Sequence, residues 1–175
     1  MKKEITQRVF ASNGQLLPLE RFDEAAINGN SVYEVIRVIK GVPLFLEDHM
    51  TRLTASAAAF DSDIHSLLPQ VLEDMKKLIA ANDSPDKNVK LVMFNLAKNV
   101  PDYVMAFVHS SYPTEQLYHE GIHTILVHAE RNNPNIKLTN TELREMIHNK
   151  LVENNAYEAL LVNNNGEITE GSKSN

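Results

Sequence analysis

The run SVYEVIRVIKGVPLFL, residues 31–46, is the segment of this sequence that most limits the possible folds. Its β-branched residues favour extended backbone, and the Lys40-Gly41 pair interrupts them as a tight turn does. Two antiparallel strands are therefore expected. Directly after them, EDHMTRLTASAAAF carries apolar residues at helical spacing, which predicts an amphipathic helix with Met50, Leu53, Ala57 and Phe60 on one face.

The segments before and after this region predict further strands and helices. ITQRVFASNGQLLPL predicts a short strand followed by a hairpin turn at Asn13-Gly14. SLLPQVLEDMKKLIAAN has the apolar spacing of a second helix. NVKLVMFNL and DYVMAFVHS have the composition of two strands, separated by a turn at residues 99–102.

The pattern lapses over SSYPTEQLYHEG, which predicts a linker and a second structural part after it. In this second part, IHTILVHAE and YEALLVN predict strands, and EITEGSKSN predicts the start of another. TELREMIHNKLVENN predicts a helix, because Thr139 and Glu142 have the spacing of a capping box at its start. The fold class predicted for the whole chain is α+β.

Composition argues against several classes of function. Of the 175 residues, 43% are hydrophobic and 23% charged, which is the balance of a soluble folded protein. A net charge of −6 argues against binding to nucleic acid or anionic membrane, and no apolar run reaches the ~18 residues of a membrane span. The start, MKKEITQRVF, lacks the apolar region of a secretory signal, and the absence of cysteine excludes disulfides and thiolate chemistry. A cytoplasmic location is expected.

One short motif raises the question of a metal. The letters HEGIH place His119 and His123 at the spacing of the H-E-x-x-H zinc motif, which requires both histidines on one helical face. Gly121 lies between them, and the following residues have strand composition, so His123 is expected in a strand. No third ligand stands out nearby, and no metal site is predicted.

A lysine offers a different chemistry. Lys137, in NPNIKLTN, lies at the end of an extended segment and just before the capped helix. A constrained and partly desolvated amine has a lowered pKa and becomes a nucleophile. Taken alone, however, Lys137 fits a solvated loop lysine better.

Three segments in order, SVYEVIRVIKGVPLFLEDHMTRLTASA, NPNIKLTN and YEALLVNNNGEITEGSKSN, resemble the class IV, or fold type IV, pyridoxal-phosphate enzymes. This family includes branched-chain aminotransferases, D-amino-acid aminotransferases and aminodeoxychorismate lyases. The resemblance implies a small N-terminal α/β domain over residues 1–114, a linker over 115–122 and the first part of a larger domain over 123–175. It also implies pyridoxal 5′-phosphate as cofactor, an amino acid and a 2-oxo acid as substrates, and a homodimer with active sites near the subunit interface.

The resemblance assigns three residues to three parts of the cofactor. Lys137 matches the lysine that bonds to the cofactor aldehyde and later moves a proton. Glu170, in ITEGSKSN, matches the carboxylate that pairs with the pyridine nitrogen and keeps it protonated. Arg52, in EDHMTRL, matches the arginine that binds the phosphate, for which a planar guanidinium is well suited. Without the resemblance, Arg52 would be interpreted as a solvated residue on a helix face.

Four further positions match family positions around the cofactor and substrate. Tyr33 matches an active-site aromatic residue, and Arg37 matches a position near the substrate pocket, although each is also compatible with an ordinary strand residue. Ser174 and Asn175 match small polar groups beside the phosphate and the ring. Lys173, between two serines, is given no role.

The substrate and the reaction type stay open at this level. The surroundings of Lys137 are closer to the D-amino-acid type, whereas EVIRV is closer to the branched-chain type, and a lyase is the alternative to an aminotransferase. Family members continue well beyond the position of Asn175, and EITEGSKSN begins a strand with no later strand to pair with. We therefore expect that the 175-residue chain by itself is not a competent enzyme, and a non-catalytic fragment is the remaining alternative.

Overall fold

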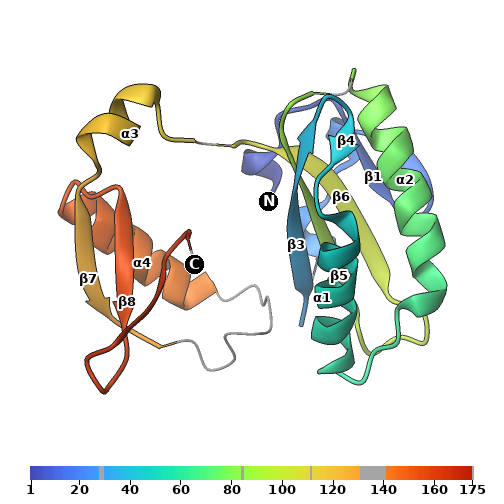
Figure 1. The fold of residues 1–175 in the computed structure, drawn as a ribbon. Coiled ribbons are helices and arrows are strands. Elements are labelled where there is room, and N and C mark those ends of the chain that lie inside the picture. Colours follow the sequence, from blue (N-terminus) through green and yellow to red (C-terminus); the bar gives the residue numbers. More distant parts are fainter. Residues whose placement is uncertain (28–29, 84, 111, 131–140, 175) are drawn as a thin grey trace. The chain divides into compact units, whose positions relative to one another are not determined.

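The computed structural model describes residues 1–27, 30–83, 85–110, 112–130 and 141–174 (Figure 1). The described residues divide into two compact units, the first ending at residue 110 and the second beginning after it. Each unit has its own sheet and its own core. The finer boundaries from the sequence, 1–114, 115–122 and 123–175, stay predictions.

The first unit is built on a six-stranded antiparallel sheet with the strand order β2-β1-β6-β5-β3-β4. Its strands are β1 (Val9–Ser12), β2 (Gln15–Pro18), β3 (Val32–Ile39), β4 (Val42–Pro43), β5 (Asn88–Phe94) and β6 (Asp102–Val108). The strands predicted in this part of the sequence are confirmed, although β4 is only two residues long.

The two predicted hairpin turns are confirmed by their backbone angles. Asn13 and Gly14 have φ values of 47° and 86°, and Lys40 and Gly41 have φ values of 49° and 78°. Two consecutive residues with positive φ are the requirement of a type I′ turn, whose twist matches that of the strands on either side. The local sequence therefore sets the register of β1 with β2 and of β3 with β4.

Two helices, α1 (Leu46–Ala58) and α2 (Leu68–Ala81), cover one face of this sheet. Figure 1 shows both helices beside the strands of the first unit. Strand residues alternate between the faces, so Val32, Ile36 and Val38 join the core under the helices. The intervening positions belong to a second apolar cluster, on the opposite face, with Phe10, Phe22, Tyr33, Val92, Phe94, Val104 and Ala106 buried in it.

A buried polar cluster ties α2 to the sheet. Tyr103 is 1% exposed, and its hydroxyl donates to Asp74 Oδ2 at 2.6 Å. Gln70 Nε2 donates to Asp74 Oδ1 at 2.9 Å, and the backbone N–H of Gly14 donates to the Tyr103 hydroxyl at 3.0 Å. Burial beside the carboxylate raises the pKa of Tyr103. The cluster satisfies polar groups that would otherwise be buried without partners.

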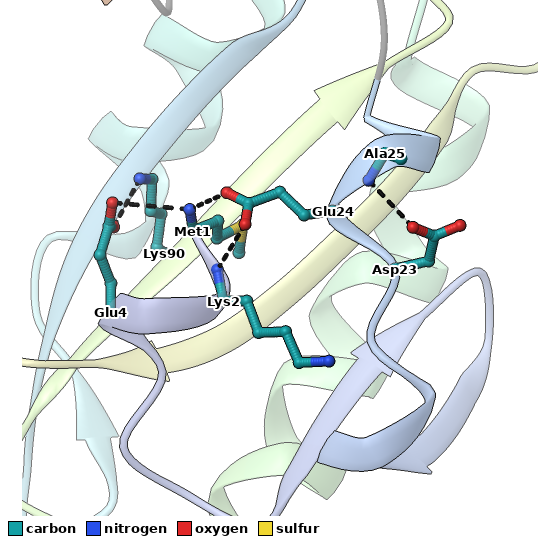
Figure 2. Close-up of polar contacts among 7 residues, drawn as sticks. All are labelled: Met1, Lys2, Glu4, Asp23, Glu24, Ala25 and Lys90. Atoms are coloured by element: carbon teal, nitrogen blue, oxygen red, sulfur yellow. Dashed lines mark hydrogen bonds and ion pairs between the residues drawn. The ribbon is translucent and has the colours of Figure 1, made fainter.

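Charged groups hold the N-terminal turn against the sheet (Figure 2). The amino group of Met1 contacts the Glu24 carboxylate and lies 3.8 Å from Glu4. Lys90 Nζ, from β5, lies 2.7 Å from the other oxygen of Glu4. The hydrogen bond from the Met1 amino group lowers the pKa of Glu24. A short turn at Glu24–Ala26 presents that carboxylate and is capped by Asp23, which accepts from the N–H of Ala25 at 3.0 Å.

The second unit contains a three-stranded sheet with the order β7-β8-β9. Its elements are α3 (Glu115–Glu120), β7 (Thr124–His128), α4 (Thr141–Glu153), β8 (Glu158–Val162) and β9 (Ile168–Gly171). β7 and β8 are parallel, as two strands joined through a helix allow, whereas β8 and β9 are antiparallel. Residues from β7, α4 and β8 form its core, with Val127, Ile147, Leu151, Ala159 and Leu161 buried.

Two details of the second unit differ from the sequence-based expectation. The segment predicted as a linker includes the helix α3, whose start is capped by Thr114 Oγ1 accepting from the N–H of Leu117 at 3.4 Å. His123 was expected in a strand, but β7 begins at the next residue. His123 still contributes its carbonyl, which accepts from the N–H of Tyr157 at 2.9 Å. The helix α4 is confirmed, while the predicted capping box at its start lies outside the described residues.

Within the described residues, no helix combines the length and the apolar character that crossing a bilayer requires.

Candidate functional site

A buried carboxylate lies in the middle of β3. Glu34 is 0% exposed and occupies an even position of the strand, between Val32 and Ile36, on the face that the helices cover. A carboxylate in such a place is strongly destabilising unless charged or hydrogen-bonding groups pair with it. The first turns of α1 supply these groups.

Arg52 of α1 pairs with Glu34 through two hydrogen bonds. Its Nε donates to Glu34 Oε1 and its Nη2 donates to Glu34 Oε2, each at 2.6 Å. This two-point contact fixes the plane of the guanidinium, and the hydrogen bonds to Glu34 raise the pKa of Arg52. The Arg52 side chain remains 46% exposed, and its Nη1 has no hydrogen-bond partner among the described residues.

His49 completes this group. It lies one turn before Arg52 on α1, and its Nδ1 is 2.7 Å from Glu34 Oε2 and 3.3 Å from Arg52 Nη2. An Nδ1–H that donates to Glu34 cannot also accept from Arg52, so the shorter distance identifies the carboxylate as its partner. One oxygen of Glu34 thus contacts two side chains of the helix.

Tyr33 and Arg37, the two predicted substrate-pocket residues, lie at odd positions of β3. Tyr33 is 6% exposed and belongs to the apolar cluster on the face opposite the helices, where Lys90 Nζ lies 5.6 Å from its ring centroid. Arg37 Nη1 donates to the carbonyl of Asp86 at 2.9 Å. Alternation along the strand therefore separates these two side chains from Glu34 and its partner Arg52.

A second buried carboxylate organises the end of the second unit. Glu158, 5% exposed, begins β8, and its Oε1 accepts hydrogen bonds from the Ser172 hydroxyl and from the N–H of Lys173 at 3.1 Å. Ser174 Oγ donates to Glu158 Oε2 at 3.4 Å. The predicted site residue Ser174 is therefore held in a turn around Glu158.

Glu170 lies just before this turn, partly buried on β9 and opposite Leu161 of β8. The chain then turns sharply, because the N–H of Gly171 donates to the carbonyl of Ser174 at 2.9 Å. A Cβ at Gly171 would meet the hydroxyl of Ser174 and would lie 3.1 Å from its carbonyl oxygen. The tight turn thus leaves little room for a side chain directly after Glu170.

The remaining predicted site residues, Lys137 and Asn175, lie outside the described residues. The zinc-like spacing of His119 and His123 does not form a helical pair, because α3 ends at Glu120. Across the described ranges, no group of three or more potential ligands is placed to hold a metal ion.

Sequence reasoning missed Glu34, His49 and Glu158. The sequence marked Glu34 only as an acidic residue within a β-branched run, at a position where alternation predicts burial. Its partners lie 15 and 18 residues later in the chain, so no local pattern links them.

Comparison with known proteins places this chain in a family. The amino-transferase class IV family pattern matches residues 31–175. The chain belongs to the class IV aminotransferases. It is 28% identical over 156 residues to D-alanine aminotransferase from Bacillus licheniformis, and 29% identical over 94 residues to aminodeoxychorismate lyase from Bacillus subtilis. These matches cover 84% and 54% of this chain.

Solved structures of class IV aminotransferases share the fold. The T.th. branched-chain amino acid aminotransferase, solved with pyridoxamine 5′-phosphate, superposes with a TM-score of 0.80 at 21% identity over 97% of this chain. The Escherichia coli branched-chain enzyme gives a TM-score of 0.79 at 19% identity over 95% of this chain. The chain is therefore a fold type IV protein.

The class IV relatives are longer than the matched region. The match covers 55% of the D-alanine aminotransferase, 31% of the lyase, 64% of the T.th. structure and 63% of the Escherichia coli structure.

Proposed function

We propose that the complete protein is a pyridoxal-phosphate-dependent aminotransferase of the cytoplasm, which moves an amino group between an amino acid and a 2-oxo acid. The observation that carries this proposal is the class IV match over residues 31–175, which includes Arg52, Lys137 and Glu170. These residue types meet the three chemical demands of the cofactor, which are a phosphate, an aldehyde and a ring nitrogen.

The described residues fit the cofactor. The guanidinium of Arg52 is held in place by Glu34 and is half exposed, and its Nη1 has no hydrogen-bond partner among the described residues. A planar cation with a free N–H donor is suited to binding a phosphate. Glu170 is a partly buried carboxylate on a strand and would pair with a pyridinium N–H. When bound, pyridoxal phosphate supplies an aldehyde and an electron-accepting ring. In the proposal, Lys137 would hold the cofactor at its aldehyde, and its amine would serve as the group that moves a proton at the reacting carbon.

The sequence relative and the structural neighbours support two different substrate classes. The D-alanine aminotransferase relative favours a D-amino acid, whereas the branched-chain neighbours favour a branched-chain substrate. Tyr33 and Arg37, on one face of β3, are our candidates for the substrate pocket. Comparing D-alanine with L-leucine as amino donors to 2-oxoglutarate in the complete protein decides between the two classes.

A lyase is the second candidate, and the aminodeoxychorismate lyase relative supports it. A lyase does not pass the amino group of its substrate to a 2-oxo acid. Product formation that accelerates on addition of 2-oxoglutarate therefore supports the transferase, and a rate that is independent of it supports the lyase.

The third candidate is a folded chain without activity of its own. The matched relatives are considerably longer than this chain, so the phosphate contacts supplied by Arg52 are only part of what we expect in a complete site. Titrating the 175-residue chain and the complete gene product with pyridoxal phosphate in parallel separates an inactive folded chain from a competent enzyme.

The first prediction is that borohydride reduction of the cofactor-bound complete protein attaches the pyridoxyl group to Lys137. Lys173 is the matched control, because it lies three residues after Glu170 in the chain and its Nζ donates to the carbonyl of Tyr157 at 3.0 Å. Peptide mapping should find the adduct in the wild type and in Lys173→Ala, and should not find it in Lys137→Ala. An adduct on another lysine, or none in the wild type, ends the proposal.

A further inference from the structure

The pair formed by Glu34 and Arg52 raises the question of why a carboxylate is buried in β3. The neighbouring inward positions of this strand carry Val32, Ile36 and Val38, and a fourth apolar side chain would meet the packing requirement. Replacing a buried ion pair by apolar residues is often neutral or stabilising. Stability alone therefore does not explain a carboxylate that is 0% exposed at this position.

The geometry of the pair offers another explanation. Glu34 occupies the Nε and Nη2 edge of the guanidinium, with both distances at 2.6 Å, and so fixes the plane of the group. The opposite donor, Nη1, has no partner in the described part of the chain, and the side chain is half exposed. A long arginine side chain held in one geometry loses less freedom when a ligand binds.

His49 strengthens the same arrangement. It is 17% exposed on its side chain and approaches Glu34 Oε2 at 2.7 Å, beside Arg52 Nη2. With contacts from both helix residues, the carboxylate cannot rotate without breaking at least one short hydrogen bond.

We propose that Glu34 is a positioning residue, which holds the guanidinium of Arg52 so that its other edge receives the phosphate group of the cofactor. This inference rests on the proposed function and deepens it. Glu34 itself does not contact the phosphate. Through Arg52, Glu34 increases the affinity that the protein has for the phosphate group of the cofactor. It leaves unchanged the affinity for the ring and the aldehyde.

The second prediction tests this separation in the complete protein. The dissociation constants of pyridoxal 5′-phosphate and of pyridoxal, which lacks the phosphate, are measured by absorbance titration of the cofactor-free protein. Their ratio reports the phosphate contribution alone. Arg52→Gln should lower the preference for the phosphorylated compound by roughly 10- to 100-fold, and Glu34→Gln by roughly tenfold, because each weakens a charge-assisted contact.

Glu47→Gln is the matched control, since Glu47 is an exposed carboxylate on the same helix. It should leave the preference unchanged. A merely structural role of Glu34 would weaken both compounds equally in Glu34→Gln, so an unchanged preference overturns the inference. A preference that rises would mean that Glu34 competes with the phosphate for Arg52, and this also overturns it.

A second variant keeps the inference testable if Glu34→Gln does not fold. Arg52→Lys retains the positive charge but lacks the planar fork that Glu34 holds. Its preference should fall, and an undiminished preference would show that the fixed plane is unimportant. If Arg52→Gln leaves the preference intact, the phosphate assignment in the proposed function fails as well. If only the Glu34 and Arg52→Lys results are negative, that assignment stands and the positioning role fails.

Discussion

At the scale of single residues, Tyr103 shows how strongly one hydroxyl can determine the stability of the first unit. It donates to the buried Asp74 and accepts from the N–H of Gly14, so it joins α2, β6 and the first hairpin turn. Removing it leaves a buried carboxylate oxygen and a backbone N–H without this partner. Such losses destabilise by about 1–3 kcal/mol.

The third prediction is that Tyr103→Phe lowers the free energy of unfolding by about that amount at pH 7. The difference between wild type and variant should shrink in strongly alkaline solution. Burial beside Asp74 raises the pKa of Tyr103 in the folded protein above its ordinary value of 10.0. The unfolded state then loses the phenolic proton first, so the contribution of Tyr103 is complete below pH 10 and is lost as the pH rises above it.

Urea unfolding of both proteins at pH 7, 9 and 10.5 measures this effect. Tyr112→Phe is the control, because the Tyr112 side chain is 53% exposed. Equal stability of Tyr103→Phe and the wild type at pH 7 would contradict the prediction.

At the scale of elements, the turn after β9 depends on Gly171. Its N–H donates to Ser174, and the next N–H, of Ser172, donates to the carbonyl of Ala159 at 2.8 Å. The backbone is thus held on both sides of the position where a Cβ would meet Ser174. An added methyl group therefore requires the Ser174 side chain to rotate and the backbone of Ser174 to move away from Gly171.

The fourth prediction is that Gly171→Ala opens this turn and speeds hydrogen exchange of the Ser172 amide at least tenfold, since a clash of this kind costs about 1–3 kcal/mol. Gly166→Ala provides the comparison. Gly166 has a φ of 80° but no atom within 4 Å of a Cβ, so its substitution strains only the hairpin turn at residues 163–167. Equal protection of the Ser172 amide in both variants would rule out the steric argument.

Elements that local sequence specifies were predictable, and the contacts between distant elements were not. The turns at Asn13-Gly14 and Lys40-Gly41 follow from two adjacent residues that tolerate positive φ. The helix α3 was missed because six residues give no apolar period, and only its cap at Thr114 marks its start. The role of Glu158 was hidden because Ser172, Lys173 and Ser174, which donate to its carboxylate, lie at least 14 residues later in the chain, after another strand.

At the scale of the whole molecule, we propose a homodimer. The edge hairpin of the first sheet exposes three apolar side chains within seven residues, with Ile39 37%, Val42 58% and Phe45 73% exposed. Ile39 and Val42 are cross-strand partners, so their side chains are neighbours. Clustered exposed apolar residues are typical of interaction surfaces, and a second copy of the chain is the partner that the family resemblance implies.

The fifth prediction is that the cofactor-bound complete protein sediments as a dimer at micromolar concentration, and that Val42→Lys shifts it toward the monomer. A desolvated lysine at an apolar interface is unfavourable, which accounts for the direction of the shift. Val152→Lys is the control, because Val152 is 67% exposed on α4 in the other unit. A wild-type monomer, or a Val42→Lys protein that stays fully dimeric, would count against this surface.

The alternation of β3 also has a consequence for how such a protein can diversify. Its even positions carry the helix-covered core and Glu34, whereas its odd positions carry Tyr33, Val35 and Arg37 on the opposite face. Variation can therefore accumulate at the odd positions without disturbing the packing under α1. A mutant library restricted to those three codons would test Tyr33 and Arg37 as our substrate-pocket candidates and would leave the helix-covered core unchanged. Any loss of stability in that library would come from the second apolar cluster, in which Tyr33 is buried and against which Val35 packs.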